Sequence, residues 1–167
     1  YAIGEQGIIE DLSAQGISVT NNAKVVIVAY DRNFTYAKLK TAMDLVEKGA
    51  KLYTAGRETN WFVGEEKHPA VGSILAAIEI ATKKEAQNLG KPAAAMKHRI
   101  LEDIFLFPED CLFIGDELSD MEFGSMCGFR TAIILSNIKS EIDIKKAKGT
   151  SKPDTIIRDA RELIAGF

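Results

Sequence analysis

Short runs of apolar, largely β-branched residues alternate with amphipathic segments along the chain, and this alternation constrains the fold more than any other feature. Val25-Val26-Ile27-Val28-Ala29 is one such run, typical of a strand buried on both faces. An amphipathic segment follows, with Thr35 as its predicted N-cap and an apolar stripe that ends before Gly49. Repeated strand–helix order of this kind predicts an α/β fold with parallel sheets.

The same patterns predict the remaining elements. Helices are expected over residues 5–14, 35–49, 71–81 and 93–105, up to Met126, and at the C-terminus. Strands are expected over residues 1–3, 25–29, 51–54, 111–114, 131–135 and 155–157. Residues 57–69 are polar and lack periodicity, which predicts a loop. A domain boundary is expected in that loop or near residues 83–87.

Composition excludes several classes of protein. The 167 residues include 46% hydrophobic and 27% charged residues, as in a globular protein, and a net charge of −3 argues against nucleic-acid binding. No apolar run is long enough to span a membrane. Cys111 and Cys127 are too few for a disulfide scaffold or a four-ligand zinc site, so we expect a cytoplasmic protein. Because Tyr1 reads as part of a strand in mid-course, we expect the sequence to begin inside a longer protein.

Three polar side chains follow predicted strands of the second half: Lys91, Asp116 and Asp120. Ligands of parallel sheets bind beyond the carboxyl ends of strands. Asp116 and Asp120 are one helical turn apart, so both carboxylates can lean toward one point. Two carboxylates suit Mg²⁺ when phosphate oxygens and water complete its coordination, and a lysine can neutralise phosphate. Because an isolated Gly-Asp before a helix is more often an N-cap, the functional interpretation depends on the order of all three residues.

Several further segments occur in a fixed order along nearly the whole chain. They are Tyr1 to Gly7, Tyr30-Asp31-Arg32-Asn33-Phe34-Thr35-Tyr36, Pro69 to Ser73, Gly90-Lys91-Pro92 with Met96, Gly115-Asp116 through Asp120, Cys127-Gly128 and Lys152-Pro153-Asp154. In these segments the chain resembles the haloacid dehalogenase (HAD) superfamily, and within it the NagD-like p-nitrophenyl phosphatase group.

The resemblance implies a Rossmann-like HAD core, present as its C-terminal part over residues 87–167, and an α/β cap domain over residues 1–86. It implies a phosphatase that uses Mg²⁺ to hydrolyse small phosphomonoesters, of the sugar phosphate or p-nitrophenyl phosphate type, through an aspartyl-phosphate. Lys91, Asp116 and Asp120 would be catalytic, Asp116 would bind the metal with Asp120 supporting it, and Asp31, Arg32 and Lys91 would bind substrate.

The chain departs from the family pattern in three places. No Asp-x-Asp-Gly nucleophile motif occurs; relatives carry it upstream of the Tyr1 equivalent, so we expect this chain to be an incomplete catalyst by itself. The Gly-Asp-x-x-x-Asp spacing is one residue shorter than usual for the group. Residues 55–58 are Ala-Gly-Arg-Glu where relatives have Thr-Asn-Pro-Asp, a segment near the substrate.

Several alternatives stay open at this stage. Asp31 and Arg32 could form a local ion pair rather than contact substrate. Trp61 and Phe62 fit either a substrate lid or a dimer contact, and a homodimer through the cap is one partner considered. The rival function is a non-catalytic α/β binding or assembly module of HAD-like fold.

Overall fold

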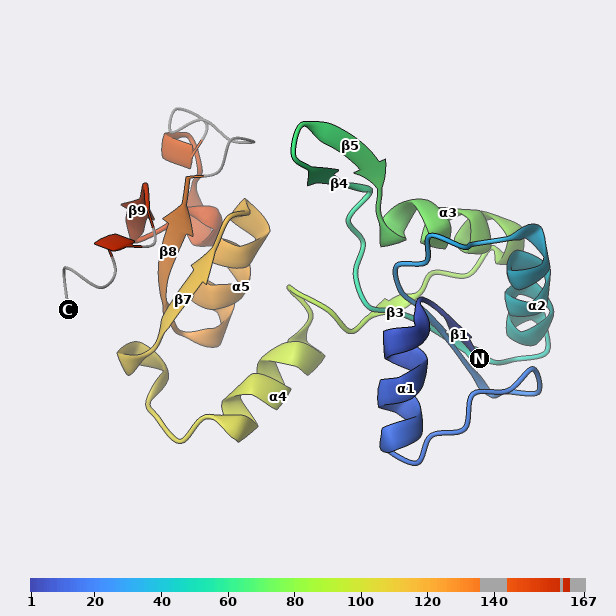
Figure 1. Ribbon diagram of the computed structural model, residues 1–167. Coiled ribbons are helices and arrows are strands. Elements are labelled where there is room, and N and C mark those ends of the chain that lie inside the picture. Colours follow the sequence, from blue (N-terminus) through green and yellow to red (C-terminus); the bar gives the residue numbers. More distant parts are fainter. Residues whose placement is uncertain (136–143, 160, 163–167) are drawn as a thin grey trace. The chain divides into compact units, whose positions relative to one another are not determined.

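Two parallel sheets form the framework of the chain. The computed structural model describes residues 1–135, 144–159 and 161–162, which belong to two compact units, Tyr1–Gly90 and Lys91–Phe167 (Figure 1). The sequence prediction of an α/β fold with parallel sheets is confirmed in both units.

Unit 1 contains a four-stranded sheet in the order β1-β2-β3-β6, with every neighbouring pair parallel. Its strands are β1 (Ala2–Ile3), β2 (Val25–Val28), β3 (Lys51–Thr54) and β6 (Gln87–Asn88). Its helices are α1 (Gln6–Ala14), α2 (Tyr36–Glu47) and α3 (Val71–Thr82). The Thr35 hydroxyl accepts from the Lys38 backbone N–H, which confirms the predicted N-cap of α2.

The core of unit 1 lies on one face of this sheet. Val26 and Val28 are fully buried there, together with Leu75 and Ile78 of α3. Val25 points to the other face and is 44% exposed. The prediction that β2 is buried on both faces is therefore wrong: α1 buries none of its residues, so the second face is only partly covered.

A β-hairpin replaces the loop predicted over residues 57–69. Its strands are β4 (Asn60–Val63) and β5 (Glu66–Pro69), which pair antiparallel. Gly64 has a φ of +62° in the two-residue turn between them, the left-handed conformation that such turns require. The hairpin was missed because the apolar residues of β4 do not alternate with polar ones, and all three are at least 37% exposed.

Unit 2 contains a three-stranded parallel sheet in the order β7-β8-β9. Its elements are α4 (Ala94–Asp103), the 3₁₀ turn η1 (Pro108–Asp110), β7 (Leu112–Gly115), α5 (Leu118–Cys127), β8 (Arg130–Ile134), the 3₁₀ turn η2 (Gly149–Ser151) and β9 (Thr155–Ile157). A Cβ on Gly124 would lie 2.7 Å from a methyl of Thr131, so α5 packs closely on β8. The predicted C-terminal helix falls mostly outside the described residues.

Two boundaries differ from the sequence prediction. Helix α4 ends at Asp103, whereas the pattern extended it to Phe105. The compact units divide after Gly90, whereas the boundary predicted from the sequence follows residue 86. The reason is that β6 bonds to β3, which adds residues 87–88 to the sheet of unit 1.

Candidate active site

Lys91 and Asp120 meet in unit 2 although 29 residues separate them in sequence. The Lys91 ammonium donates to Oδ1 of Asp120 at 2.7 Å. The two side chains differ in exposure, at 45% for Lys91 and 7% for Asp120. The pair therefore joins a half-exposed lysine side chain to a buried carboxylate.

The second oxygen of Asp120 holds the start of α5. Oδ2 accepts from the backbone N–H groups of Asp116 and Glu117, both at 3.2 Å. Glu117 is the N-cap of α5, and its side chain accepts in turn from the Asp120 backbone N–H, which completes a capping box. Gly115 makes this approach feasible, because a Cβ there would lie 2.3 Å from that of Asp120. Asp120 therefore fixes both Lys91 and the turn that carries Asp116.

Asp116 lies directly after β7, at the carboxyl end of a parallel strand, and is exposed. Its backbone is fixed by Asp120, and within the described ranges no side chain donates to its carboxylate. Among those same residues, no group of three or more His, Cys, Asp and Glu side chains could hold a metal ion. The exposed Asp116 carboxylate nevertheless fits Mg²⁺, which commonly takes one or two protein carboxylates and completes its shell with water and phosphate.

Asp31 and Arg32 each have a partner within unit 1. Asp31 is buried and accepts from the Lys38 ammonium at 2.6 Å and from the Asn33 backbone N–H at 2.9 Å. Arg32 forms a bidentate pair with Glu5, which lowers the pKa of the Glu5 carboxyl and raises that of the guanidinium through direct hydrogen bonding. Asp31 and Arg32 therefore do not pair with each other; Asp31 pairs with Lys38 and Arg32 with Glu5.

Asp31 and Arg32 also line a cavity of about 430 Å³ in unit 1, together with Tyr30 and His68. Trp61 of the hairpin packs edge-on against Tyr30, with ring centroids 5.4 Å apart, and lies 6.0 Å from the His68 ring. His68 is a cavity residue that the sequence analysis did not identify. The register of β4 with β5, which pairs Trp61 with His68, is the signal that could have found it.

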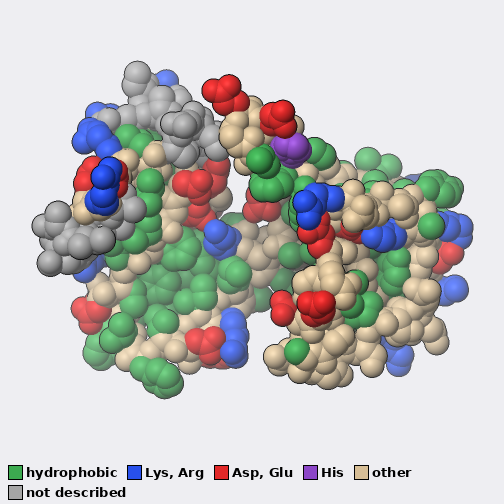
Figure 2. All heavy atoms as spheres, in the orientation of Figure 1, with side chains coloured by type: hydrophobic (Ala, Val, Ile, Leu, Met, Phe, Trp, Pro, Cys, Tyr) green, Lys and Arg blue, Asp and Glu red, His purple; other side chains and the backbone are tan. Residues whose placement is uncertain are grey.

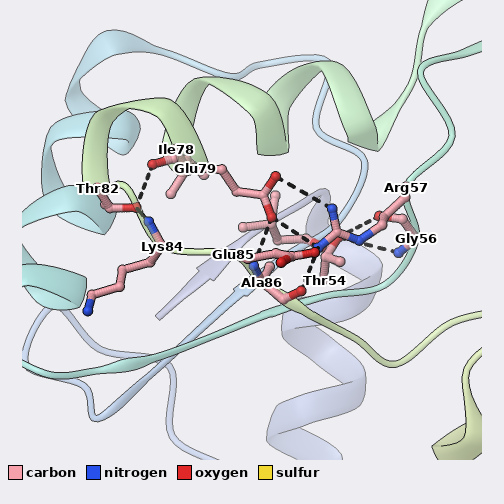
Figure 3. A network of polar contacts seen from close by, with 10 residues as sticks. Thr54, Gly56, Arg57, Ile78, Glu79, Thr82, Lys84, Glu85 and Ala86 are labelled. Atoms are coloured by element: carbon pink, nitrogen blue, oxygen red, sulfur yellow. Dashed lines mark hydrogen bonds and ion pairs between the residues drawn. The ribbon is translucent and has the colours of Figure 1, made fainter.

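Arg57, one of the residues that departs from the family pattern, has a structural role in unit 1 (Figure 3). Its guanidinium donates to the Glu79 carboxylate at 3.0 Å and to the Ala86 carbonyl at 2.6 Å. Glu79 also accepts from the Ala86 N–H at 2.8 Å. The network ties the segment after β3 to α3 and to the chain entering β6, so Arg57 is engaged within the fold.

Comparisons with known proteins show which family the chain is similar to. Residues 88–163 match the HAD-hydrolase-like family. Rat chronophin is 30% identical over 149 residues, covering 84% of this chain and 48% of chronophin. An acid sugar phosphatase of Staphylococcus saprophyticus is 27% identical, and the match covers 98% of this chain and 64% of that phosphatase.

A crystal structure of a 4-nitrophenylphosphatase from Thermotoga maritima superposes with a TM-score of 0.90, at 27% identity, over 99% of this chain and 64% of that protein. In residues 88–163 the chain is similar to the haloacid dehalogenase-like hydrolases. It spans about half the length of curated relatives such as chronophin and a dihydroxyacetone phosphatase of Corynebacterium glutamicum.

Proposed function

We propose that the protein containing this chain is a Mg²⁺-dependent phosphatase of small phosphomonoesters. The observation that carries the proposal is the Lys91–Asp120 pair at the turn that presents Asp116. Relatives named for phosphatase activity on sugar phosphates and on 4-nitrophenyl phosphate support it.

Each residue of this group has a distinct part in the proposal. The Asp116 carboxylate would hold Mg²⁺, with Asp120 supporting it, and the ion would neutralise phosphate charge. The Lys91 ammonium would bind a phosphate oxygen while Asp120 keeps it in place. Asp120 also fixes the Asp116 backbone, so loss of Asp120 would disturb both partners.

The nucleophile of the proposed aspartyl-phosphate route is not in this sequence, which has no Asp-x-Asp-Gly. Strand β7 lies at one edge of its sheet, and Ile114 on it is 41% exposed. An unpaired edge of a parallel sheet can accept another strand. We place the nucleophile on such a strand, beside Asp116.

Asp31 and Arg32, which line the cavity of unit 1, would contact the substrate. Tyr30 and His68 give the cavity flat, largely apolar walls, and the Arg32–Glu5 and Asp31–Lys38 pairs balance their charges. Arg32→Gln should then raise KM, by different factors for different phosphomonoesters, while kcat changes little.

The proposal also includes the cellular compartment of the protein. Both cysteines are free thiols, and among the residues described no helix is long and apolar enough to cross a membrane. We place the protein in the reducing cytoplasm, which suits two unpaired cysteines.

The test is a 4-nitrophenyl phosphate assay of the natural polypeptide that contains this sequence. We expect EDTA to abolish turnover and Mg²⁺ to restore it. Lys91→Met should lower kcat about a hundredfold, whereas the matched control Lys48→Met, at an exposed position of unit 1, should have no effect. A polypeptide without Mg²⁺-dependent turnover would instead support the rival, a non-catalytic binding or assembly module.

A further inference from the structure

Lys91 follows a glycine whose place in the fold excludes any side chain. A Cβ on Gly90 would lie 1.9 Å from the carbonyl oxygen of Ala55, so the close approach of these two backbone segments requires glycine. Glycine also has the greatest conformational freedom of all residues. Because the backbone of Lys91 continues directly from Gly90, a freely rotating Gly90 would leave the starting point of the Lys91 side chain unfixed.

The side-chain amide of Asn88 fixes this glycine. Its Oδ1 accepts from the Gly90 N–H at 3.1 Å, and its Nδ2 donates to the Gly90 carbonyl at 3.2 Å. Peptide groups are planar, so the N–H belongs to the plane that joins Leu89 to Gly90 and the carbonyl to the plane that joins Gly90 to Lys91. The two backbone dihedral angles of Gly90 are the rotations between these planes. An amide that bonds to both planes therefore fixes both angles.

The backbone that carries the Asn88 amide is itself held by the sheet of unit 1. Asn88 ends β6 and lies opposite Thr54 of β3 in the parallel register. The Leu89 N–H donates to the Thr54 carbonyl at 2.9 Å, and Thr54 is fully buried. Asn88 is half-buried, which limits competition from water for its amide. The hydrogen bonds to Gly90 thus extend the order of the sheet as far as Lys91.

The other end of Lys91 needs this support. Its ammonium bonds to Asp120, but an ion pair of a half-exposed lysine is weak, and the four-carbon stem allows the ammonium many positions. Acidic and basic side chains are interspersed over the face of each unit that Figure 2 shows, so a field of one sign does not place the ammonium. Its position depends on local bonds at both ends of the residue.

We propose that Asn88 is a positioning residue for Lys91. By fixing Gly90, Asn88 sets the point from which the Lys91 side chain starts, and so places the ammonium for its contact with a phosphate oxygen. The inference rests on the proposed function, in which Lys91 binds phosphate. Asn88 acts through Lys91, and that property separates it from a residue that only stabilises the fold.

Turnover of 4-nitrophenyl phosphate by the natural polypeptide tests the proposal. Asn88→Leu has a similar volume and removes both hydrogen bonds to Gly90. Because the backbone of one residue is then released, kcat should fall about tenfold. KM should change less, since the ammonium matters most where charge develops in the transition state. Gln87→Leu, the same kind of change at the exposed neighbour in β6, is the matched control and should keep kcat within about twofold of wild type.

A double-mutant cycle with Lys91→Met separates positioning from a general disturbance of the sheet. If Asn88 acts through Lys91, Asn88→Leu should cause no further loss of kcat in the Lys91→Met background. A disturbed sheet would lower kcat by the same factor in both backgrounds. Thermal melting followed by circular dichroism checks that each variant folds.

Amide hydrogen exchange followed by NMR tests the same hydrogen bonds without an activity assay. In Asn88→Leu the Gly90 amide should exchange faster, because it loses its acceptor. The Leu89 amide keeps its bond to the Thr54 carbonyl and should exchange at the wild-type rate, which makes it an internal control.

The outcomes distinguish this inference from the proposed function. With an active wild type, three results would overturn the inference alone: equal kcat for Asn88→Leu and Gln87→Leu, an equal loss in both backgrounds of the cycle, or an unchanged Gly90 exchange rate. A wild type without Mg²⁺-dependent turnover would overturn the proposed function, and this inference with it.

Discussion

Removal of the buried Asp120 carboxylate should open the start of α5. Asp120→Ala takes an acceptor from two backbone N–H groups and a partner from Lys91. Loss of a helix cap costs about 1 kcal/mol, and an ion pair to a half-exposed ammonium adds about 1 kcal/mol. We expect a total near 2 kcal/mol, roughly a thirtyfold change in the local opening constant.

Native-state amide hydrogen exchange measures this loss directly, from peptides that cover α5. Asp120→Asn keeps one oxygen acceptor but no charge, so we expect about half the effect. Glu122→Ala, at an exposed position of the same helix, is the matched control and should change the opening free energy by less than about 0.5 kcal/mol. If Asp120→Ala matches that control, Asp120 does not organise the site and the reasoning fails.

Three further outcomes are expected. Burial raises the pKa of the Cys127 thiol, so an alkylating reagent should label the half-buried Cys111 first and Cys127 only on unfolding, which mass spectrometry would detect; equal rates would contradict this. Because Arg32 holds the pKa of Glu5 below 4.5, this pair should stabilise the fold above that pH and lose its effect as pH falls through the lowered pKa; carboxyl NMR titration should show the Glu5 pKa returning toward 4.5 in Arg32→Gln, and an unchanged pKa would refute the pairing. Gly124→Ala should lower the free energy of unfolding by about 1–2 kcal/mol in urea titration, because the added methyl overlaps its neighbours by more than helix propensity returns; a stabilised variant would contradict the packing.

The elements that sequence reasoning found are those whose pattern follows their burial. Strand β3 and its neighbours carry apolar side chains into one core, and the Thr35 cap is a local hydrogen bond. Both signals lie within a few residues of chain, so they can be seen without knowing the tertiary structure.

What sequence reasoning missed depends on contacts between distant residues. The hairpin forms although its apolar side chains are exposed, so its sequence lacks the alternation of apolar and polar residues that predicts a half-buried strand. Asp31 pairs with Lys38 in the first turn of α2, and Arg32 pairs with Glu5, which follows the neighbouring strand β1; neither partner is adjacent in sequence. The role of Arg57 is likewise fixed by Glu79 and Ala86, more than 20 residues away.

The candidate site shows the same division. The order of Lys91, Asp116 and Asp120 predicts that they act together, and the Lys91–Asp120 contact could be anticipated from strand ends in a parallel sheet. The separate roles of the two Asp120 oxygens could not be predicted, because they depend on which oxygen accepts from Lys91 and which from the backbone.

The most direct test of the central claim is the turnover of the natural polypeptide carrying Asp116→Asn, measured with 4-nitrophenyl phosphate at saturating Mg²⁺. If Asp116 holds the ion beside the phosphate, kcat should fall by about a thousandfold or more while the fold is retained. Turnover within about twofold of wild type would contradict the account.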